Sequence, residues 1–408
     1  MNRENVNPYK VIIIGGGASG LVLAISLANK FQSDSVLLLE KLDRVGKKLL
    51  STGNGRCNLS NTDNEFIHYH SENNGYFNEI INRYSSKVSE FFKTIGVPFS
   101  VEENKVYPLS KQASSVVDAL RFKLESIGEI VRTSIRANSI KKQNNTFEVL
   151  CENGEKFYAQ NVVVCVGGKA QKHLGTDGSS YSLLTGFNHT LTKLYPSIVQ
   201  LKVKDLLRIK GLKGLKQKVS AKALVNGKPV AFTEGDLMFT EYGLSGNVAF
   251  YLSSYLSGKN GGAIEVDFCP ELSKDELYSL LLAKQKDCGY LIGEYLLSGV
   301  MNLKISQSIL RNEKIANLQG GVDSVDLSKV VSAVKNYRID ILDTMGFDNA
   351  QVTKGGIRVD DFNPTTLESK LVSGLYATGE VLDIDGDCGG YNLNWAFCSA
   401  LAVSDSIL

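Results

Sequence analysis

The chain has 408 residues, of which 43% are hydrophobic and 22% charged, so it is long enough for two or three domains with substantial cores. Its 45 Lys and Arg residues nearly balance 43 Asp and Glu residues, and this net charge indicates neither a nucleic-acid nor a membrane partner. The polar start MNRENVNPYK is no signal peptide, no apolar run is long enough to span a membrane, and none of the seven cysteines form a C-x-x-C pair. We expect a reduced, cytoplasmic protein without a metal; its oligomeric state stays open.

The first predicted element is a buried strand that runs into a glycine-rich turn. In the segment VIIIGGGASG, four β-branched residues precede Gly15, Gly17 and Gly20, and an apolar helical segment follows. Gly15 permits a tight turn, Gly17 lets the backbone approach a pyrophosphate, and Gly20 lets the helix pack closely on the sheet. Glu40 ends the next buried strand, VLLLE, where a carboxylate can accept from ribose hydroxyls. This order predicts a dinucleotide-binding βαβ unit over residues 10–40, but it does not separate FAD from NAD.

A polar loop with several glycines is expected next, from Leu42 to Gly75. Its glycines allow close approach of the backbone to a ligand. Cys57 and Asn58, in the stretch GNGRCN, could reach the edge of a flavin ring, and the alternative is a solvated turn rich in asparagine and glycine. The loop also contains cations that suit phosphate or flavin oxygens, namely Lys47, Lys48 and Arg56.

Two amphipathic helices and several strands follow. Apolar residues at three- and four-residue steps predict a helix from Phe77 to Ile95 and a second from Val116 to Ile127. Strand-like runs are expected at 130–142 and 146–151. The buried strand NVVVCVGG then ends in paired glycines, Gly167 and Gly168, which we interpret as a second contact with the nucleotide.

The pattern changes from about residue 191. Short alternating segments predict an antiparallel sheet or barrel over 191–270, and helices are expected over 271–349, the first with a capping box of Ser273 and Glu276. Strands and glycine-rich turns return from residue 350.

The last motif is LYATGEVLDIDGDCGGYNLNWAFCSA, in which Gly389 and Gly390 lead into an apolar helix that begins near Asn392. The N-terminus of such a helix can stabilise negative charge on the N1/O2 edge of a reduced flavin. Three alternating aspartates in this motif lack the glycine and the terminal glutamate of a calcium loop. No second G-x-G-x-x-G follows a buried strand, so a nicotinamide would have to enter the flavin pocket itself, unless another reactant reoxidises the flavin.

With these segments, the chain resembles the YhiN/BaiN-like bacterial FAD flavoproteins, known as NAD(P)/FAD-dependent oxidoreductases or aminoacetone oxidases. The resemblance covers essentially the full length and rests on GNGRCN, FTEYGLSG, TKGGI and GEVLDIDGDCGGYNLNWAF. It implies an α/β fold, in which a Rossmann-like FAD-binding domain of the two-dinucleotide-binding-domain type is formed by residues 1–190 and 350–408. An inserted β-barrel-like domain (191–270) and a helical subdomain (271–349) interrupt it.

The resemblance also implies roles for individual residues. Gly15, Gly17, Ser19 and Gly20 would hold the pyrophosphate, Glu40 the adenosine ribose, and the backbone of Ile135, in a crossover strand, the adenine. The full set of expected cofactor-binding residues is Gly15, Gly17, Ala18, Ser19, Gly20, Glu40, Lys41, Gly46, Lys47, Lys48, Thr52, Gly53, Gly55, Arg56, Cys57, Asn58, Ile135, Val166, Gly167, Gly168, Gly379, Glu380, Gly389, Gly390, Tyr391 and Asn392.

The leading hypothesis is an FAD-dependent oxidoreductase that transfers a hydride through flavin N5, with NAD(P)H as a transient reductant and a small organic molecule as substrate. The alternatives are an oxygen-using oxidase of a small amine such as aminoacetone, a flavin-bound sensor without turnover, and an RNA-associated flavoprotein. The last would use the basic run Leu201–Ser220, but this run has no interleaved aromatic residue for base stacking. Tyr391, Tyr242 and Glu241 are candidate proton donors or acceptors, and no catalytic residue is assigned.

Overall fold

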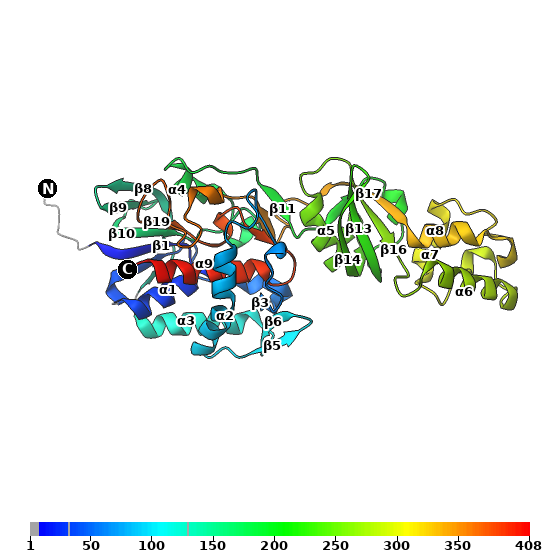
Figure 1. Ribbon diagram of the computed structural model, residues 1–408, viewed down its shortest axis with the longest axis horizontal. Coiled ribbons are helices and arrows are strands. Elements are labelled where there is room, and N and C mark those ends of the chain that lie inside the picture. Colours follow the sequence, from blue (N-terminus) through cyan, green and yellow to red (C-terminus); the bar gives the residue numbers. More distant parts are fainter. Residues whose placement is uncertain (1–7, 32, 129) are drawn as a thin grey trace. The chain divides into compact units, whose positions relative to one another are not determined.

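The protein separates into two units in the computed structural model, which describes residues 8–31, 33–128 and 130–408. The first unit comprises residues 1–195 and 351–408, as far as they are described, and the second comprises 196–350. The first unit thus joins the two ends of the chain, and the blue N-terminal helix α1 lies beside the red C-terminal helix α9 (Figure 1).

A seven-stranded mixed sheet forms the centre of the first unit, with the order β7-β2-β1-β10-β9-β8 and with β19 also paired to β10. The strands β7, β2, β1, β10 and β19 run parallel, whereas β9 is antiparallel to both β10 and β8. The bounds are β1 (Tyr9–Ile14), β2 (Val36–Leu39), β7 (Val131–Arg132), β8 (Ala137–Gln143), β9 (Thr146–Cys151), β10 (Lys156–Val164) and β19 (Leu375–Ala377).

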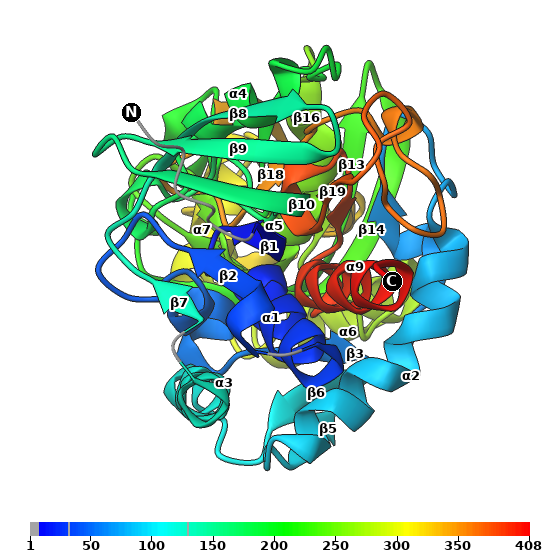
Figure 2. The same ribbon diagram turned by 90° about the vertical axis from the view of Figure 1, so that its left-hand side faces the viewer.

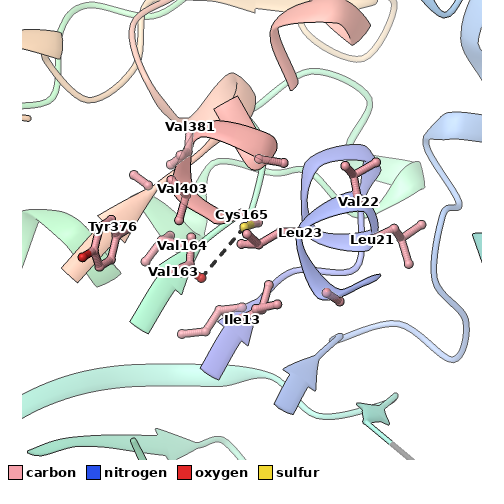
Figure 3. Packing of buried hydrophobic residues seen from close by; sticks show 14 of the residues in the cluster. Ile13, Leu21, Val22, Leu23, Val163, Val164, Cys165, Tyr376, Val381 and Val403 are labelled. Atoms are coloured by element: carbon pink, nitrogen blue, oxygen red, sulfur yellow. Dashed lines mark hydrogen bonds between the residues drawn. The ribbon is translucent and has the colours of Figure 1, made fainter. Parts of the chain in front are cut away.

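Helices α1 and α9 lie side by side on one face of this sheet (Figure 2). Helix α1 is buried on almost every side, as expected for a helix held between a sheet and other helices. Figure 3 shows Leu23 of α1 on the side of the strand residues Ile13 and Val163, and Leu21 and Val22 on the other side of the helix. Helix α2 packs against α9, and α3 packs against α1. The two helices predicted from Phe77 to Ile95 and from Val116 to Ile127 are confirmed as α2 and α3. The bounds are α1 (Ala18–Lys30), α2 (Asn78–Thr94), α3 (Ala113–Ile127), α4 (Ser182–Thr185) and α9 (Tyr391–Ser406).

The single strand predicted over 130–142 is wrong, because β7 and β8 are separate. Between them Ser134 has a φ of 57°, and its N–H donates to the carbonyl of Leu42. The next N–H, of Ile135, donates to the carbonyl of Glu40 at 2.9 Å. Ile135 therefore lies in a connection beside the end of β2, and not in a crossover strand.

Three small sheets lie outside the seven-stranded sheet and the barrel. They are a three-stranded sheet of β3 (Ser60–Asn61), β6 (Lys105–Pro108) and β5 (Phe99–Glu102), the pair β4 (Tyr69–His70) and β20 (Asp385–Gly386), and the pair β11 (Tyr195–Ser197) and β18 (Val352–Lys354).

The second unit is a closed barrel with attached helices. Its strand order is β12-β15-β14-β13-β16-β17. The strands are β12 (Leu201–Val203), β13 (Lys216–Val225), β14 (Lys228–Phe239), β15 (Gly243–Ser245), β16 (Gly262–Asp267) and β17 (Tyr337–Thr344). The helices are α5 (Gly246–Leu256), α6 (Lys274–Asp287), α7 (Leu303–Asn312) and α8 (Leu327–Lys335).

The barrel closes through a strand that lies inside the range where only helices were predicted. Strand β17 pairs with β12 on one side and with β16 on the other, so it returns to the barrel after three helices. The barrel and the helical segment therefore belong to one unit. The predicted capping box is confirmed, since the hydroxyl of Ser273 accepts from the Glu276 N–H and the Glu276 carboxylate accepts from the Ser273 N–H.

Among the described residues, no helix combines the length and the apolar character that crossing a bilayer would need.

Candidate functional site

The glycine-rich turn joins β1 to the N-terminus of α1. A Cβ atom at Gly15 would lie 2.5 Å from the Cys165 carbonyl oxygen, and one at Gly20 would lie 1.9 Å from the Gly15 oxygen. Gly17 differs, because a Cβ there would meet no atom within 4 Å. The first N–H groups of a helix lack intrahelical partners and carry roughly half a positive charge. An open space at this point fits the predicted diphosphate.

Glu40 holds this turn from the end of β2. One carboxylate oxygen accepts from the Gly16 N–H at 2.7 Å and the other from the Leu42 N–H at 2.8 Å. Burial raises the pKa of Glu40 although both hydrogen bonds oppose this rise. Each oxygen can accept a further hydrogen bond, so the role of Glu40 toward a ribose stays a prediction.

Lys48 links two of the segments predicted to share the site. Its Nζ lies 2.8 Å from one oxygen of Glu380, and the other oxygen of Glu380 accepts from the Thr353 N–H at 2.7 Å. The turn after β10 is held against the same threonine, since a Cβ at Gly168 would lie 2.4 Å from its Oγ1. The tertiary structure thus brings the 45–61, 166–170 and 375–400 segments together.

Two other predicted cations are engaged by carboxylates. Lys41 lies 3.6 Å from Asp177. Arg56 lies 2.5 Å from Glu102 and stacks over the ring of Tyr107, with 4.1 Å between the guanidinium carbon and the ring centroid. Contact of Arg56 with a cofactor stays a prediction, and it would have to compete with this pair.

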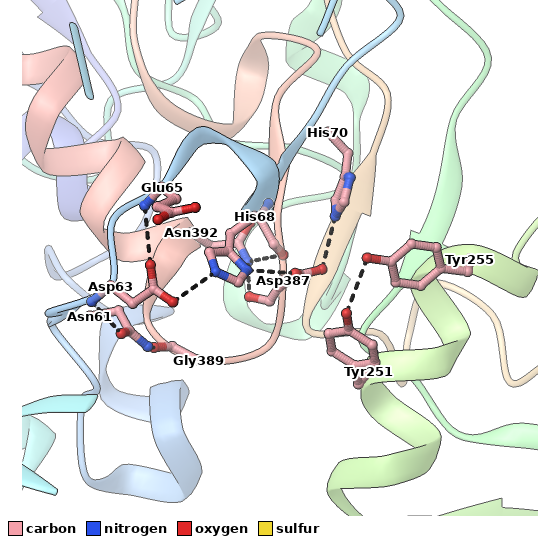
Figure 4. Close-up of polar contacts among 11 residues, drawn as sticks. Asn61, Asp63, Glu65, His68, His70, Tyr251, Tyr255, Asp387, Gly389 and Asn392 are labelled. Carbon is pink, nitrogen blue, oxygen red and sulfur yellow. Dashed lines mark hydrogen bonds and ion pairs between the residues drawn. The ribbon is translucent and has the colours of Figure 1, made fainter. Parts of the chain in front are cut away.

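The start of α9 meets the GNGRCN loop. A Cβ at Gly390 would lie 2.5 Å from the Ser60 carbonyl oxygen and 2.8 Å from Asn58 Oδ1. The Asn61 side-chain amide donates to the Gly389 carbonyl at 2.9 Å, as Figure 4 shows. Predicted cofactor residues from opposite ends of the chain are therefore neighbours at one helix N-terminus.

Several buried polar atoms in the first unit lack a partner among the described residues. They include Asn58 Oδ1, the Tyr181 hydroxyl and both carboxylate oxygens of Asp385. Buried polar groups in native proteins nearly always have partners, so orphans of this kind suit a polar ligand. Together with the free space at Gly17, they show that the residues present fit a dinucleotide.

Cys57, by contrast, is a poor redox partner. Its side chain is fully buried, and burial raises its pKa to about 12. The thiolate is the reactive form of cysteine, so this thiol is inert near neutral pH.

A histidine–aspartate network that was not predicted from the sequence lies beside α9. Asp387 Oδ2 lies 3.0 Å from His68 Nδ1, and its Oδ1 lies 2.8 Å from His70 Nε2 (Figure 4). The ring of His68 stacks on predicted Tyr391 at 4.4 Å between centroids. A signal was present, because HYH and DIDGD both alternate polar residues on one face of a strand. The described residues include no group of three or more His, Cys, Asp or Glu side chains that could hold a metal ion.

The model of the HI0933-like protein Rossmann domain matches residues 9–406 of this chain. The chain belongs to the HI0933-like family. The predicted Rossmann-like FAD fold and the prediction of an FAD-dependent oxidoreductase are thereby confirmed.

Known proteins similar to this member of the HI0933-like family include two kinds of enzyme. A 3-dehydro-bile acid delta(4,6)-reductase of Clostridium scindens is 35% identical over 400 residues, which cover 96% of this chain and 97% of that protein. A ribosomal RNA dihydrouridine synthase of Haemophilus influenzae is 28% identical over 407 residues, covering 97% and 98%. The crystal structure of a 3-ketosteroid-delta4-(5alpha)-dehydrogenase from Rhodococcus jostii RHA1 has a TM-score of 0.50 at 14% identity, covering 99% and 98%, and is similar in fold.

Proposed function

We propose that this protein reduces a carbon–carbon double bond conjugated with a carbonyl group, with NAD(P)H as the electron source. The observation that carries the proposal is the chemistry shared by the two similar enzymes. Both names denote saturation of such a bond, in a steroid dienone for one and in a uracil ring for the other. A reductase is therefore favoured over an oxidase of small amines.

The residues of the first unit would bind and orient FAD, which supplies the hydride through its N5 atom when bound. The N–H groups at the start of α1 would hold the diphosphate beside Gly17, and Glu40 would lie at the ribose. The N-terminus of α9 would stabilise negative charge that develops in the site. Buried side chains around it would exclude water.

We further propose a small organic substrate in preference to RNA. Four basic residues of the run over 201–220 are already engaged by carboxylates. The pairs are Arg208 with Glu313, Lys213 with Glu241, Lys216 with Asp236 at 2.7 Å, and Lys218 with Glu271 at 3.8 Å. A paired lysine offers less to a phosphate than a free one. RNA is the second candidate, because a ribosomal RNA dihydrouridine synthase is among the similar proteins.

Anaerobic half-reactions test this function. Purified holoprotein is mixed with NADH or NADPH, and the flavin absorbance band is followed. The reduced protein is then mixed separately with cyclohexenone, with a ribosomal RNA transcript, or with oxygen. We expect bleaching by a nicotinamide and rapid recovery of the band with the enone. Recovery of the flavin band with the RNA transcript but not with the enone would favour RNA as the substrate. Reduction of the flavin by aminoacetone, but by neither NADH nor NADPH, would contradict the proposed reductase.

A further inference from the structure

Asp385 is a buried carboxyl group without a hydrogen-bond partner in the described part of the chain. Only 1% of the residue is exposed, and neither carboxylate oxygen is bonded. The aspartates on either side are satisfied: Asp383 accepts from the Glu72 N–H at 3.0 Å, and Asp387 bridges two histidines. An unpaired buried carboxyl group is costly, so its presence calls for a functional explanation.

The fold places Asp385 next to the first turn of α9. Strand β20 consists of Asp385 and Gly386. The side chain of Asn392, in that first turn, accepts from the Gly386 N–H at 2.9 Å and donates to its carbonyl at 2.7 Å. A Cβ at Gly386 would lie 2.6 Å from that of Tyr391. Asp385 thus directly precedes Gly386, and Gly386 is hydrogen-bonded to the first turn of α9. We predict that this end of α9 faces the flavin.

A hydrogen-bonded chain that reaches solvent ends beside this point, at His70. Asp63, whose side chain is 44% exposed, lies 3.2 Å from His68 Nε2. His68 Nδ1 contacts Asp387, and Asp387 contacts His70. In the pairing of β4 with β20, His70 is directly opposite Asp385, so the two side chains lie on one face. The hydrogen-bonded chain is therefore Asp63, His68, Asp387 and His70, and Asp385 faces its last member without a hydrogen bond.

The charges around Asp385 oppose one another. Burial, Asp383 and Asp387 favour its protonated form, whereas Lys354 on β18 and His70 on β4 favour the ionised form. Burial dominates and raises the pKa of Asp385 to about 7. Burial alone would lower the pKa of His70, but its hydrogen bond to Asp387 and the charges of Asp387 and Asp385 raise it. A group that exchanges its proton near neutral pH is what general acid catalysis needs.

We propose that Asp385 donates the proton that accompanies hydride transfer in this site, and that the chain from Asp63 to His70 returns a proton from solvent. This inference rests on the proposed function. Bound reduced FAD would supply the hydride for the C–H bond at the β carbon of the enone, and the π pair of the double bond would move toward the carbonyl oxygen. The proton of Asp385 then forms the C–H bond at the α carbon. Asp385 is left as a carboxylate and regains its proton from water through the chain.

Asp385→Asn tests the proposal, with the exposed carboxylate variant Asp360→Asn as the matched control. Infrared spectra of the holoproteins should show a carboxylic acid C=O band that titrates near pH 7 in the parent and in Asp360→Asn, and not in Asp385→Asn. Flavin content and reduction by NADPH should stay unchanged in all three proteins. Reoxidation by cyclohexenone should be slowed at least about 100-fold in Asp385→Asn alone. Asp387→Asn, which breaks the chain at one histidine, should slow later turnovers more than the first.

Two results would overturn the inference: absence of the titrating band from the parent protein, or equal rates of reoxidation by the enone for Asp385→Asn and the parent. A parent protein that no enone reoxidises would instead remove the proposed function. In that case the infrared band decides: a band that titrates near pH 7 and is lost in Asp385→Asn still upholds Asp385 as the proton-holding group, and its absence from the parent overturns this.

Discussion

The two units treat a partly buried aspartate of one and a buried aspartate of the other in opposite ways. In the second unit, Asp267 at the end of β16 lies 2.6 Å from Lys335 Nζ, and the lysine also donates to the carbonyl groups of Cys269 and Leu272. Asp385 in the first unit has no bonded partner among the described residues. In the second unit, the buried polar atoms without a hydrogen-bond partner are Gln200 Oε1, Ser257 Oγ and Arg208 Nε, and none of them belongs to a carboxylate. Another nitrogen of Arg208, Nη2, is paired with Glu313.

The ion-paired Asp267 connects parts of the second unit, whereas the carboxyl group of Asp385 has no hydrogen-bond partner that would prevent it from binding a ligand. A buried ion pair whose remaining donors are satisfied holds elements together and has little capacity left for a ligand. A buried carboxyl group without partners has its pKa set by desolvation and is free to bond an incoming molecule. We therefore expect changes in the two units to have different consequences, on cofactor and activity in the first unit and on stability in the second.

The largest expected effect is the loss of cofactor from Gly17→Val. The backbone of Gly17 is extended and a Cβ there meets no protein atom, so the variant should fold. The valine would fill the space predicted for the diphosphate, and flavin affinity should fall at least about 100-fold, or roughly 3 kcal/mol. Flavin absorbance per purified protein measures this. Gly289→Val is the control, because a Cβ at Gly289 also meets nothing within 4 Å; equal flavin content in both variants would contradict our placement of the phosphate loop.

Removing the partner of the partly buried Asp267 in the second unit should cost stability. Lys335→Met leaves Asp267 without its ion pair, and we expect a loss of about 2 kcal/mol in the free energy of unfolding, between the values for exposed and buried pairs, with flavin content kept. Lys329→Met lies on the same helix but removes a lysine whose side chain is 70% exposed, so it should change stability by less than about 1 kcal/mol. Denaturant unfolding compares the two, and similar losses would show that burial of the Asp267 pair is unimportant.

Asp385→Asn should act in the opposite direction, and its effect should depend on pH. The pKa of Asp385 in the folded state, about 7, is above its ordinary 3.8. Between these values the folded state binds the proton more tightly than the unfolded state, so this group lowers stability as pH rises from about 4 to about 7. Asparagine does not titrate. The variant should therefore exceed the parent in unfolding free energy by a few kcal/mol above pH 7 and approach it near pH 4. A difference independent of pH would show that the carboxyl group is not perturbed.

The smallest effect is expected at the cap of α6. Ser273→Ala removes the acceptor for the Glu276 N–H and should cost about 1 kcal/mol, whereas Ser273→Thr should keep most of the cap. Thermal unfolding of the second unit reports the change, and flavin content should not respond to either variant. A loss of flavin would mean that the two units are more strongly coupled than the contrast between them implies.

Local patterns predicted much of the fold and part of the site. The strand, the three glycines, the helix α1 and Glu40 lie within a single βαβ unit, so their order in the chain determines their arrangement. Helices α2 and α3 and the cap at Ser273 likewise depend on residues a few positions apart. These features were predictable because the interactions that form them are short in sequence.

The remaining features depend on contacts between distant segments, which no local pattern encodes. The sequence predicts strand β17 as part of a helical region. In the structure it pairs with β12 and β16 and closes the barrel. His70 and Asp387 are 317 residues apart, and only the pairing of β4 with β20 brings them within 2.8 Å. The pKa of Asp385 depends on burial and on Lys354 and His70 from other strands. The sequence therefore predicted a dinucleotide-binding segment, whereas only the tertiary structure raises the pKa of Asp385, because desolvation is a property of the packed state.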